Sequence, residues 1–123
     1  MPQPSYAIIA VTFKCNAKCI MCDIWKRESG QEMEPSFYQR VPSSLREINI
    51  TGGEPFLRED LPEVIEVIHN RCDSPRIVIS SNGLLSERIE DSMNRIVKVD
   101  PKIAVRISID AVGKKHDELR GIS

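Results

Sequence analysis

Three cysteines lie within eight residues, as Cys15, Cys19 and Cys22 in the segment CNAKCIMC. Three residues separate the first pair and two residues separate the second. Thiolates on one short loop can hold a metal centre. Three protein ligands leave one coordination position open, and an open position is where a metal does chemistry. The loop therefore predicts a reactive metal site.

The length, net charge and composition of the chain exclude several other functions. The chain has 123 residues, which suits a single domain at 1–123, and its net charge is −1 with few aromatic residues. These features argue against a nucleic-acid surface. No apolar run is long enough for a membrane span, and no basic region precedes the short apolar stretch at 6–13. We expect a cytoplasmic protein with reduced thiols, in which cysteines indicate a metal site before disulfides.

The elements that must position the loop alternate along the chain. Apolar segments predict parallel strands at 6–13, 47–51, 76–80 and 103–110, the first of them buried on both faces. Helical patterns begin at Pro35, at Asp60 and Ser86 as caps, and at Lys114. This alternation predicts an α/β fold of parallel β-α repeats with right-handed crossovers.

Chemically unusual segments follow each expected strand. In parallel α/β folds, ligands gather at the carboxyl ends of the strands, so we expect one shared rim. The segments are 15–22, Gly52–Pro55 (GGEP), Ser80–Gly83 (SSNG) and Ser108–Asp110 (SID). In the last strand the period of two predicts that one face packs under the helices, namely Ile103, Val105, Ile107 and Ile109. The other face carries Arg106, Ser108 and Asp110, and we expect it to line a cavity.

The identity of the metal is the next question. A structural zinc site needs a fourth ligand. Cys72 and His69 lie at the end of a helix before the third strand, so we expect them at the opposite rim, out of reach of Cys22. We interpret Cys72 as a packed thiol and His69 as a solvent-facing imidazole. An iron–sulfur cluster with three protein ligands fits better, and a structural zinc module stays as an alternative.

Taken together, these residues resemble the motifs of the radical S-adenosylmethionine (radical SAM) superfamily. Its loop has a hydrophobic or aromatic residue before the third cysteine, where this chain has Met21. Gly52–Pro55 matches the GGEP motif of that family. Ser108–Asp110 and 116–121 (HDELRG) resemble segments of the branch with molybdenum-cofactor and peptide-modifying members. The resemblance covers 6–121 and implies part of a TIM-like barrel, with about four strands and three crossover helices present and the C-terminal units missing.

The resemblance also implies cofactors. A 4Fe–4S cluster on Cys15, Cys19 and Cys22 would bind SAM at its open iron. An electron from a donor such as flavodoxin or ferredoxin would cleave SAM to methionine and a 5′-deoxyadenosyl radical, which takes hydrogen from an unknown substrate. No catalytic side chain is assigned beyond this site. The implied cofactor-binding residues are Met21, Gly52, Gly53, Glu54, Ser80, Asn82, Ser108 and Asp110.

The expected roles of these residues differ. Gly52 and Gly53 would let backbone approach the methionine amino group, since they have no side chain to block it. Glu54 would fix that turn, or would be only a charge at a helix start. Ser80 and Asn82 would hold ribose hydroxyls or a carboxylate, although Asn82 before a glycine is also ordinary turn chemistry. By resemblance, Ser108 would bind the SAM carboxylate and Met21 would lie near adenine.

Two further expectations concern the barrel. A strand at 103–110 without a next neighbour would be an open edge, and we expect another copy of the chain or crystal contacts to cover it. The alternatives to an active enzyme are a catalytically incompetent truncated scaffold and the zinc module. Peptide, nucleoside, lipid and sugar substrates all remain open.

Overall fold

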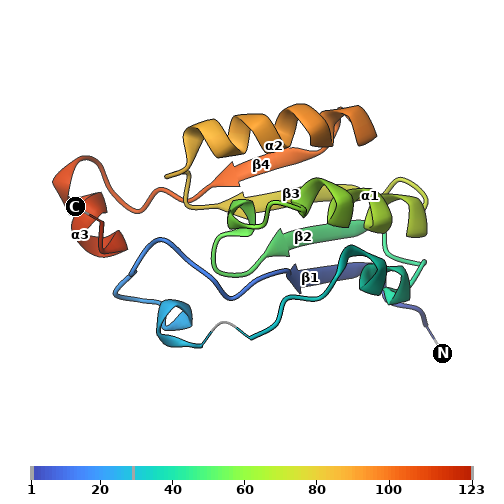
Figure 1. Ribbon diagram of the computed structural model, residues 1–123, viewed down its shortest axis with the longest axis horizontal. Coiled ribbons are helices and arrows are strands. Elements are labelled where there is room, and N and C mark those ends of the chain that lie inside the picture. The colour runs from blue at the N-terminus through green and yellow to red at the C-terminus, as the bar shows by residue number, and fades with distance from the viewer. Residues whose placement is uncertain (1, 29, 123) are drawn as a thin grey trace.

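Four strands form one parallel sheet, and their spatial order is the same as their order in the chain (Figure 1). The computed structural model describes residues 2–28 and 30–122. The strands are β1 Tyr6–Ala10, β2 Glu47–Thr51, β3 Arg76–Ser81 and β4 Ala104–Ile107. Each connection therefore joins neighbouring parallel strands, and the sheet stays open. This arrangement confirms the predicted α/β fold of β-α repeats.

Helices cover one face of this sheet (Figure 1). The α-helices are α1 Leu61–Arg71, α2 Ser86–Val99 and α3 Lys114–Arg120. Short 3₁₀ helices are η1 Ile24–Lys26, η2 Pro35–Arg40 and η3 Pro55–Leu57. The first crossover thus carries η2, which begins at Pro35 as predicted and ends one residue before Val41-Pro42. Helix α3 lies beyond the carboxyl ends of the strands, beside the cysteine loop.

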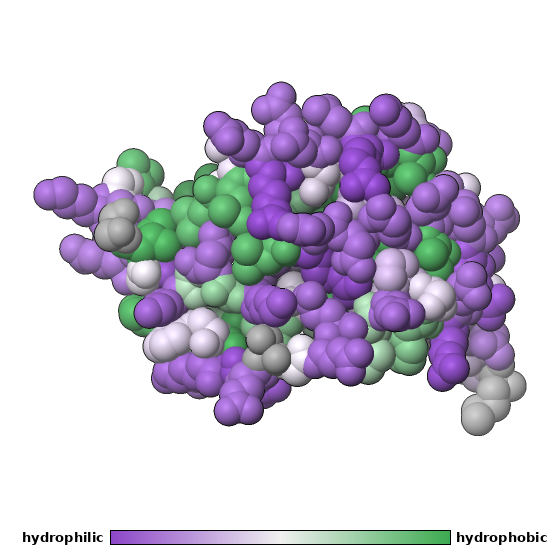
Figure 2. All heavy atoms as spheres, in the orientation of Figure 1, coloured by the Kyte–Doolittle hydropathy of each residue, from purple (hydrophilic) through white to green (hydrophobic). Residues whose placement is uncertain are grey.

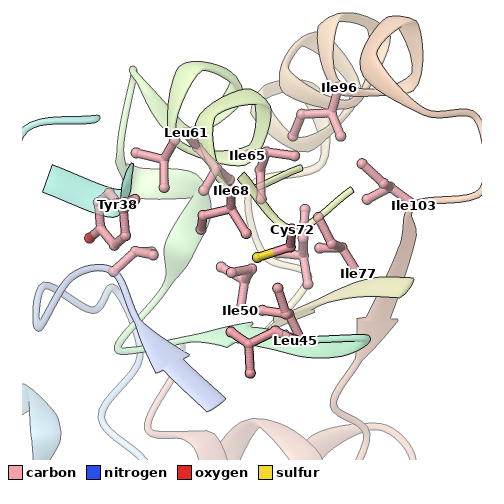
Figure 3. Packing of buried hydrophobic residues seen from close by; sticks show 14 of the residues in the cluster. Tyr38, Leu45, Ile50, Leu61, Ile65, Ile68, Cys72, Ile77, Ile96 and Ile103 are labelled. Atoms are coloured by element: carbon pink, nitrogen blue, oxygen red, sulfur yellow. The ribbon is translucent and has the colours of Figure 1, made fainter. Parts of the chain in front are cut away.

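The core lies between the helices and the covered face of the sheet (Figure 3). Alternate residues of the two central strands are fully or almost fully buried there, namely Ile48, Ile50, Ile77 and Ile79. Helix α1 buries an apolar stripe against them, at Leu61, Val64, Ile65 and Ile68. This packing fixes where the carboxyl ends of β2 and β3 lie. Figure 2 shows a mainly hydrophilic surface over the helical layer, with apolar side chains gathered toward the end where α3 lies.

The edge strands differ from the expectation. The first strand is shorter than 6–13, and it is not buried on both faces, because Tyr6 and Ile8 are 55% and 60% exposed. No element in the described part of the chain covers that face of the sheet. In the last strand, Ile103 is buried but Ile107 and Ile109 are 44% and 74% exposed, so the predicted apolar face fails there. Pairing with β3 ends at Ile107, and the chain then leaves the sheet.

The predicted helix caps are also wrong in detail. Asp60 precedes α1 but makes no side-chain cap bond, because its carboxylate pairs with Arg58 instead. Leu85, not Ser86, occupies the N-cap position of α2, and Ser86 is the first helical residue. Across 2–28 and 30–122, no helix has the length and apolar character that a membrane crossing requires.

Candidate cofactor site

A cavity of about 230 Å³ lies at the carboxyl ends of the strands. All four predicted rim segments contribute to its wall, as parallel strands require. Its lining includes every predicted site residue except Glu54: Cys15, Cys19, Cys22, Met21, Gly52, Gly53, Ser80, Asn82, Ser108 and Asp110. The site residues assigned from the sequence omit other members of the lining, above all Ser81 and Arg120. Trp25, which the sequence places just after the loop as a shield for the cluster or as part of the core, also lies in the lining. The topology therefore brings the three thiols and the polar rim together around one space.

The three loop cysteines are free thiols with different exposure. Cys19 is buried, while Cys15 and Cys22 are half-buried. The loop is held by its own backbone, since Cys22 N donates to Cys19 O at 3.2 Å. Trp25 Nε1 donates to the same carbonyl oxygen at 3.2 Å, so the indole covers one side of the loop. The chain thus presents three soft sulfur donors at one short turn, a donor set that suits iron–sulfur chemistry.

The pKa of the Cys15 thiol is raised above its ordinary value of 9.0. Burial is the largest cause, and the nearby Cys19, Glu54 and Cys22 raise it further, against a backbone hydrogen bond at Ala17 that lowers it. Cys15 is therefore a neutral thiol at neutral pH in the metal-free chain. Metal binding must displace its proton.

Single-ion coordination is a separate question from cluster binding. Within residues 2–28 and 30–122, no three His, Cys, Asp or Glu side chains converge as ligands of one metal ion. A cubane cluster places each cysteine on a different iron, so its ligands do not converge in this way. The donor set fits the cluster on its chemistry. The arrangement does not match a tetrahedral zinc site, whose four ligands share one ion.

Cys72 lies far from this rim, as predicted. It ends α1 and is buried in the core, where its thiol contacts Pro42 O at 3.5 Å (Figure 3). His69 is not the solvent-facing imidazole that we expected, because Nε2 lies 3.2 Å from Asp100 Oδ2 and the side chain is mostly buried. The reason is that Asp100, the residue directly after α2, lies beside the last turn of α1.

Gly52 and Gly53 hold the cysteine loop against the second strand. Gly52 has a φ of 138°, and a Cβ there would lie 2.2 Å from Thr12 O. At Gly53 a Cβ would lie 2.0 Å from Lys14 O and 2.9 Å from Cys15 Cβ. Backbone bonds join the same segments, from Gly53 N to Thr12 O at 2.9 Å. The glycines are therefore required for close approach of two backbones, in addition to any approach of a cofactor.

Glu54 is fully buried and is not among the residues that line the cavity. Oε1 accepts from Phe56 N at 3.3 Å and Ser81 Oγ at 2.9 Å, and Oε2 accepts from Asn82 N at 2.8 Å. These bonds tie the GGEP turn to the end of β3. These three hydrogen bonds are the contacts that the turn-fixing role expected of Glu54 requires.

The third rim segment makes turn contacts. Asn82 Oδ1 accepts from Leu84 N at 3.0 Å, and its Nδ2 donates to Asn16 Oδ1 at 2.8 Å. The second bond connects β3 to the cysteine loop across 66 residues of sequence. Ser80 Oγ donates to Asn49 Oδ1 at 2.9 Å. Both side chains still line the cavity, so their contacts preorganise the rim without closing it.

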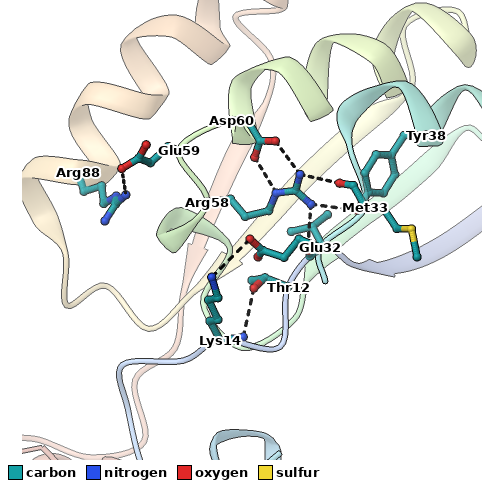
Figure 4. Close-up of polar contacts among 10 residues, drawn as sticks. Thr12, Lys14, Glu32, Met33, Tyr38, Arg58, Glu59, Asp60 and Arg88 are labelled. Atoms are coloured by element: carbon teal, nitrogen blue, oxygen red, sulfur yellow. Dashed lines mark hydrogen bonds and ion pairs between the residues drawn. The ribbon is translucent and has the colours of Figure 1, made fainter. Parts of the chain in front are cut away.

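The start of the cysteine loop is fixed by a buried arginine (Figure 4). Arg58 is 3% exposed, and it donates to Val11 O at 2.9 Å and to Met33 O at 2.8 Å. Two further bonds of 2.8 Å reach the Asp60 carboxylate, so the guanidinium is satisfied by a forked ion pair. The pKa of Asp60 is lowered, chiefly by this hydrogen bond from Arg58. Arg58 therefore joins the end of β1 to the segment before η2.

The fourth rim segment carries an ion pair that the sequence analysis missed. Arg120 Nε lies 2.5 Å from Asp110 Oδ2, and Arg120 Nη1 donates to Cys19 Sγ at 3.5 Å. Burial lowers the pKa of Arg120, but the contacts with Asp110 and Cys19 outweigh it, so the pKa is raised. Arg120 belongs to the HDELRG segment, which the sequence analysis singled out but to which it assigned no role at the site. Asp110 N also donates to His116 Nδ1 at 3.2 Å.

Comparison with known proteins gives a consistent result. A family model described as Radical SAM superfamily matches residues 9–123. Probable GTP 3′,8-cyclase from Methanococcus vannielii is 31% identical over 121 residues, covering 92% of this chain and 39% of that protein. GTP 3′,8-cyclase from Campylobacter jejuni subsp. doylei is 31% identical over 121 residues, covering 90% of this chain and 36% of that protein. The chain thus spans less than two fifths of the length of these relatives.

Solved structures share the fold. The crystal structure of Streptococcus suis SuiB bound to S-adenosylmethionine matches 97% of this chain and 28% of that chain, with a TM-score of 0.79 and 22% identity. The crystal structure of BtrN in complex with AdoMet and 2-DOIA matches 76% of this chain and 43% of that chain, with a TM-score of 0.59 and 25% identity. These matches confirm the predicted parallel β-α architecture.

Proposed function

The chain belongs to the radical SAM superfamily of iron–sulfur enzymes, and from this premise we propose that its rim binds a 4Fe–4S cluster and SAM. Cys15, Cys19 and Cys22 would hold the cluster. The observation that carries the proposal is that one cavity is lined both by the three thiols and by residues at the ends of β2 and β3 and in the segment after β4. When bound, this pair of cofactors supplies reductive cleavage of the SAM sulfonium.

The chain's own residues bind, orient and exclude water. The turn at Gly52–Pro55 sets the distance between the cysteine loop and β2, because neither glycine leaves room for a side chain. Ser80, Asn82 and Ser108 offer hydroxyl and amide groups to the polar parts of SAM, while Met21 and Trp25 give the cavity its apolar wall. Glu54 holds the turn and the end of β3 in register.

The substrate is a separate proposal. The curated relatives are named as GTP 3′,8-cyclases, which makes GTP the first substrate to test. The electron donor, flavodoxin or ferredoxin, and the pairing of the β4 edge with another copy both stay predictions.

The test is anaerobic reconstitution of the chain and of two matched cysteine variants. We expect the unchanged chain to turn brown and to bind about four iron and four sulfide per chain. Cys72→Ala should load equally, because Cys72 lies in the core away from the rim. Cys19→Ala should lose the cluster while it keeps a native circular dichroism spectrum. Equal loading of both variants, or zinc in place of iron in the unchanged chain, would contradict the proposal.

A further inference from the structure

The end of α3 is attached to the middle of the cysteine loop. Lys18 N donates to Arg120 O at 2.9 Å, and Ile20 N donates to Leu119 O at 2.9 Å. Gly121 ends the helix with a φ of 63°, and a Cβ there would lie 2.2 Å from Lys18 O. The helix end and the loop are therefore in backbone contact on both sides of the middle cysteine.

This backbone contact brings the Arg120 side chain next to Cys19. Its Nη1 lies 3.5 Å from Cys19 Sγ, within hydrogen-bond distance for a sulfur acceptor. The Asp110 carboxylate lies beside Nε of the guanidinium as its ion-pair partner, which keeps the Arg120 side chain at this end of the loop. The Arg120 side chain is 16% exposed and Cys19 is 7% exposed, so little water competes for the sulfur. An arginine keeps its charge at every working pH, so a permanent cation lies beside this thiol.

The effect of such a cation on a cluster has a definite sign. Hydrogen bonds to the sulfurs, net charge and solvent exposure set the reduction potential of an iron–sulfur cluster. Reduction adds one negative charge, taken from an external one-electron reductant, and no bond forms or breaks. A donor and positive charge at a ligating sulfur stabilise the more negative state more than the oxidised state. The potential therefore rises, and the cluster accepts its electron more readily.

We propose that Arg120 raises the reduction potential of the cluster by donating a hydrogen bond to the Cys19 sulfur, with Asp110 as the residue that orients it. The proposal rests on the proposed function, because it requires a cluster on the three cysteines. It assigns Arg120 a role in setting the potential, distinct from its backbone contacts with the loop.

The experiment is an anaerobic redox titration of the reconstituted chain, followed by electron paramagnetic resonance of the reduced cluster. Arg120→Gln removes the charge. Lys115→Gln is the matched control, because it makes the same change of charge in the same helix at an exposed position. At a fixed potential, we expect the ratio of reduced to oxidised cluster to fall about tenfold in Arg120→Gln, which is about 59 mV for a one-electron couple. Lys115→Gln should shift the ratio less than twofold.

Each outcome decides the proposal. Equal shifts of the reduction potential in Arg120→Gln and Lys115→Gln, or no shift in either, would overturn the proposed role of Arg120. The proposed function would stand in that case, because the cluster would still be bound. If Arg120→Gln does not retain iron, the same titration on Arg120→Lys decides, since lysine keeps the charge but lacks the planar fork. An Arg120→Lys potential below that of the unchanged chain supports the proposal. An unchanged potential would overturn the proposal as stated, because the retained charge, and not the hydrogen bond from arginine, would then account for the potential. A chain that binds no cluster at all refutes the proposed function itself.

Discussion

Replacing Glu54 with glutamine should destabilise the protein far more than one lost charge on its surface would. The carboxylate is fully buried and accepts hydrogen bonds from Phe56 N, Ser81 Oγ and Asn82 N. A glutamine amide has only one oxygen, so its NH₂ group must face at least one backbone N–H of these donors. Each hydrogen bond to a buried charged group is worth about 1.5–3 kcal/mol, and one orphaned donor costs about 1–3 kcal/mol. We therefore expect a loss of about 2–3 kcal/mol.

Urea unfolding followed by circular dichroism measures this loss. With a slope of about 1.5 kcal/mol per molar urea, the midpoint should fall by about 1–2 M. The matched control is Glu59→Gln, because the Glu59 side chain is 91% exposed and its ion pair with Arg88 is a surface contact at 3.5 Å. That variant should stay within about 0.5 kcal/mol of the unchanged chain. Equal midpoints for Glu54→Gln and Glu59→Gln would refute the turn-fixing role of Glu54.

Three further perturbations test other parts of the rim. Gly53→Ala should prevent cluster loading, because its Cβ would lie 2.0 Å from a loop carbonyl oxygen; Gly30→Ala, with nothing within 4 Å, should load normally. The pKa of Asp60 is lowered from 3.8, so its ion pair with Arg58 stabilises the protein above pH 3.8 and is lost as the pH falls through the folded pKa. Asp60→Asn should therefore make the free energy of unfolding depend less on pH below 3.8, and it should cost at most about 1 kcal/mol at pH 7. Because the pKa of Cys15 is raised, apparent iron affinity in reconstitution titrations should increase from pH 7 to pH 9, and a flat profile would contradict the displaced proton.

The sequence predicted the elements and their shared rim because both follow from local patterns. Alternation of apolar segments and helices determines a parallel sheet, and parallel strands bring Cys15, Gly52, Ser80 and Ser108 to one edge. The same logic placed Cys72 at the other end of the sheet.

The sequence pattern could not predict contacts between segments that are far apart in the chain. The contact of Arg120 Nη1 with Cys19 Sγ spans 101 residues of sequence, and nothing in the spacing of HDELRG shows which loop the helix meets. The burial of Glu54 likewise depends on Ser81 and Asn82, which follow another strand. The apolar pattern at 6–13 also overstated burial, because a strand's period of two cannot reveal whether a second layer covers it.

The measurement that tests the central claim most directly is the formation of 5′-deoxyadenosine. The chain is reconstituted anaerobically, given SAM and a strong one-electron reductant, and the products are separated by chromatography with mass detection. The account predicts 5′-deoxyadenosine and methionine from the unchanged chain and from Cys72→Ala, and neither product from Cys19→Ala. A fully loaded cluster that leaves SAM intact would contradict the claim that this rim binds and cleaves SAM, and would favour the incompetent scaffold.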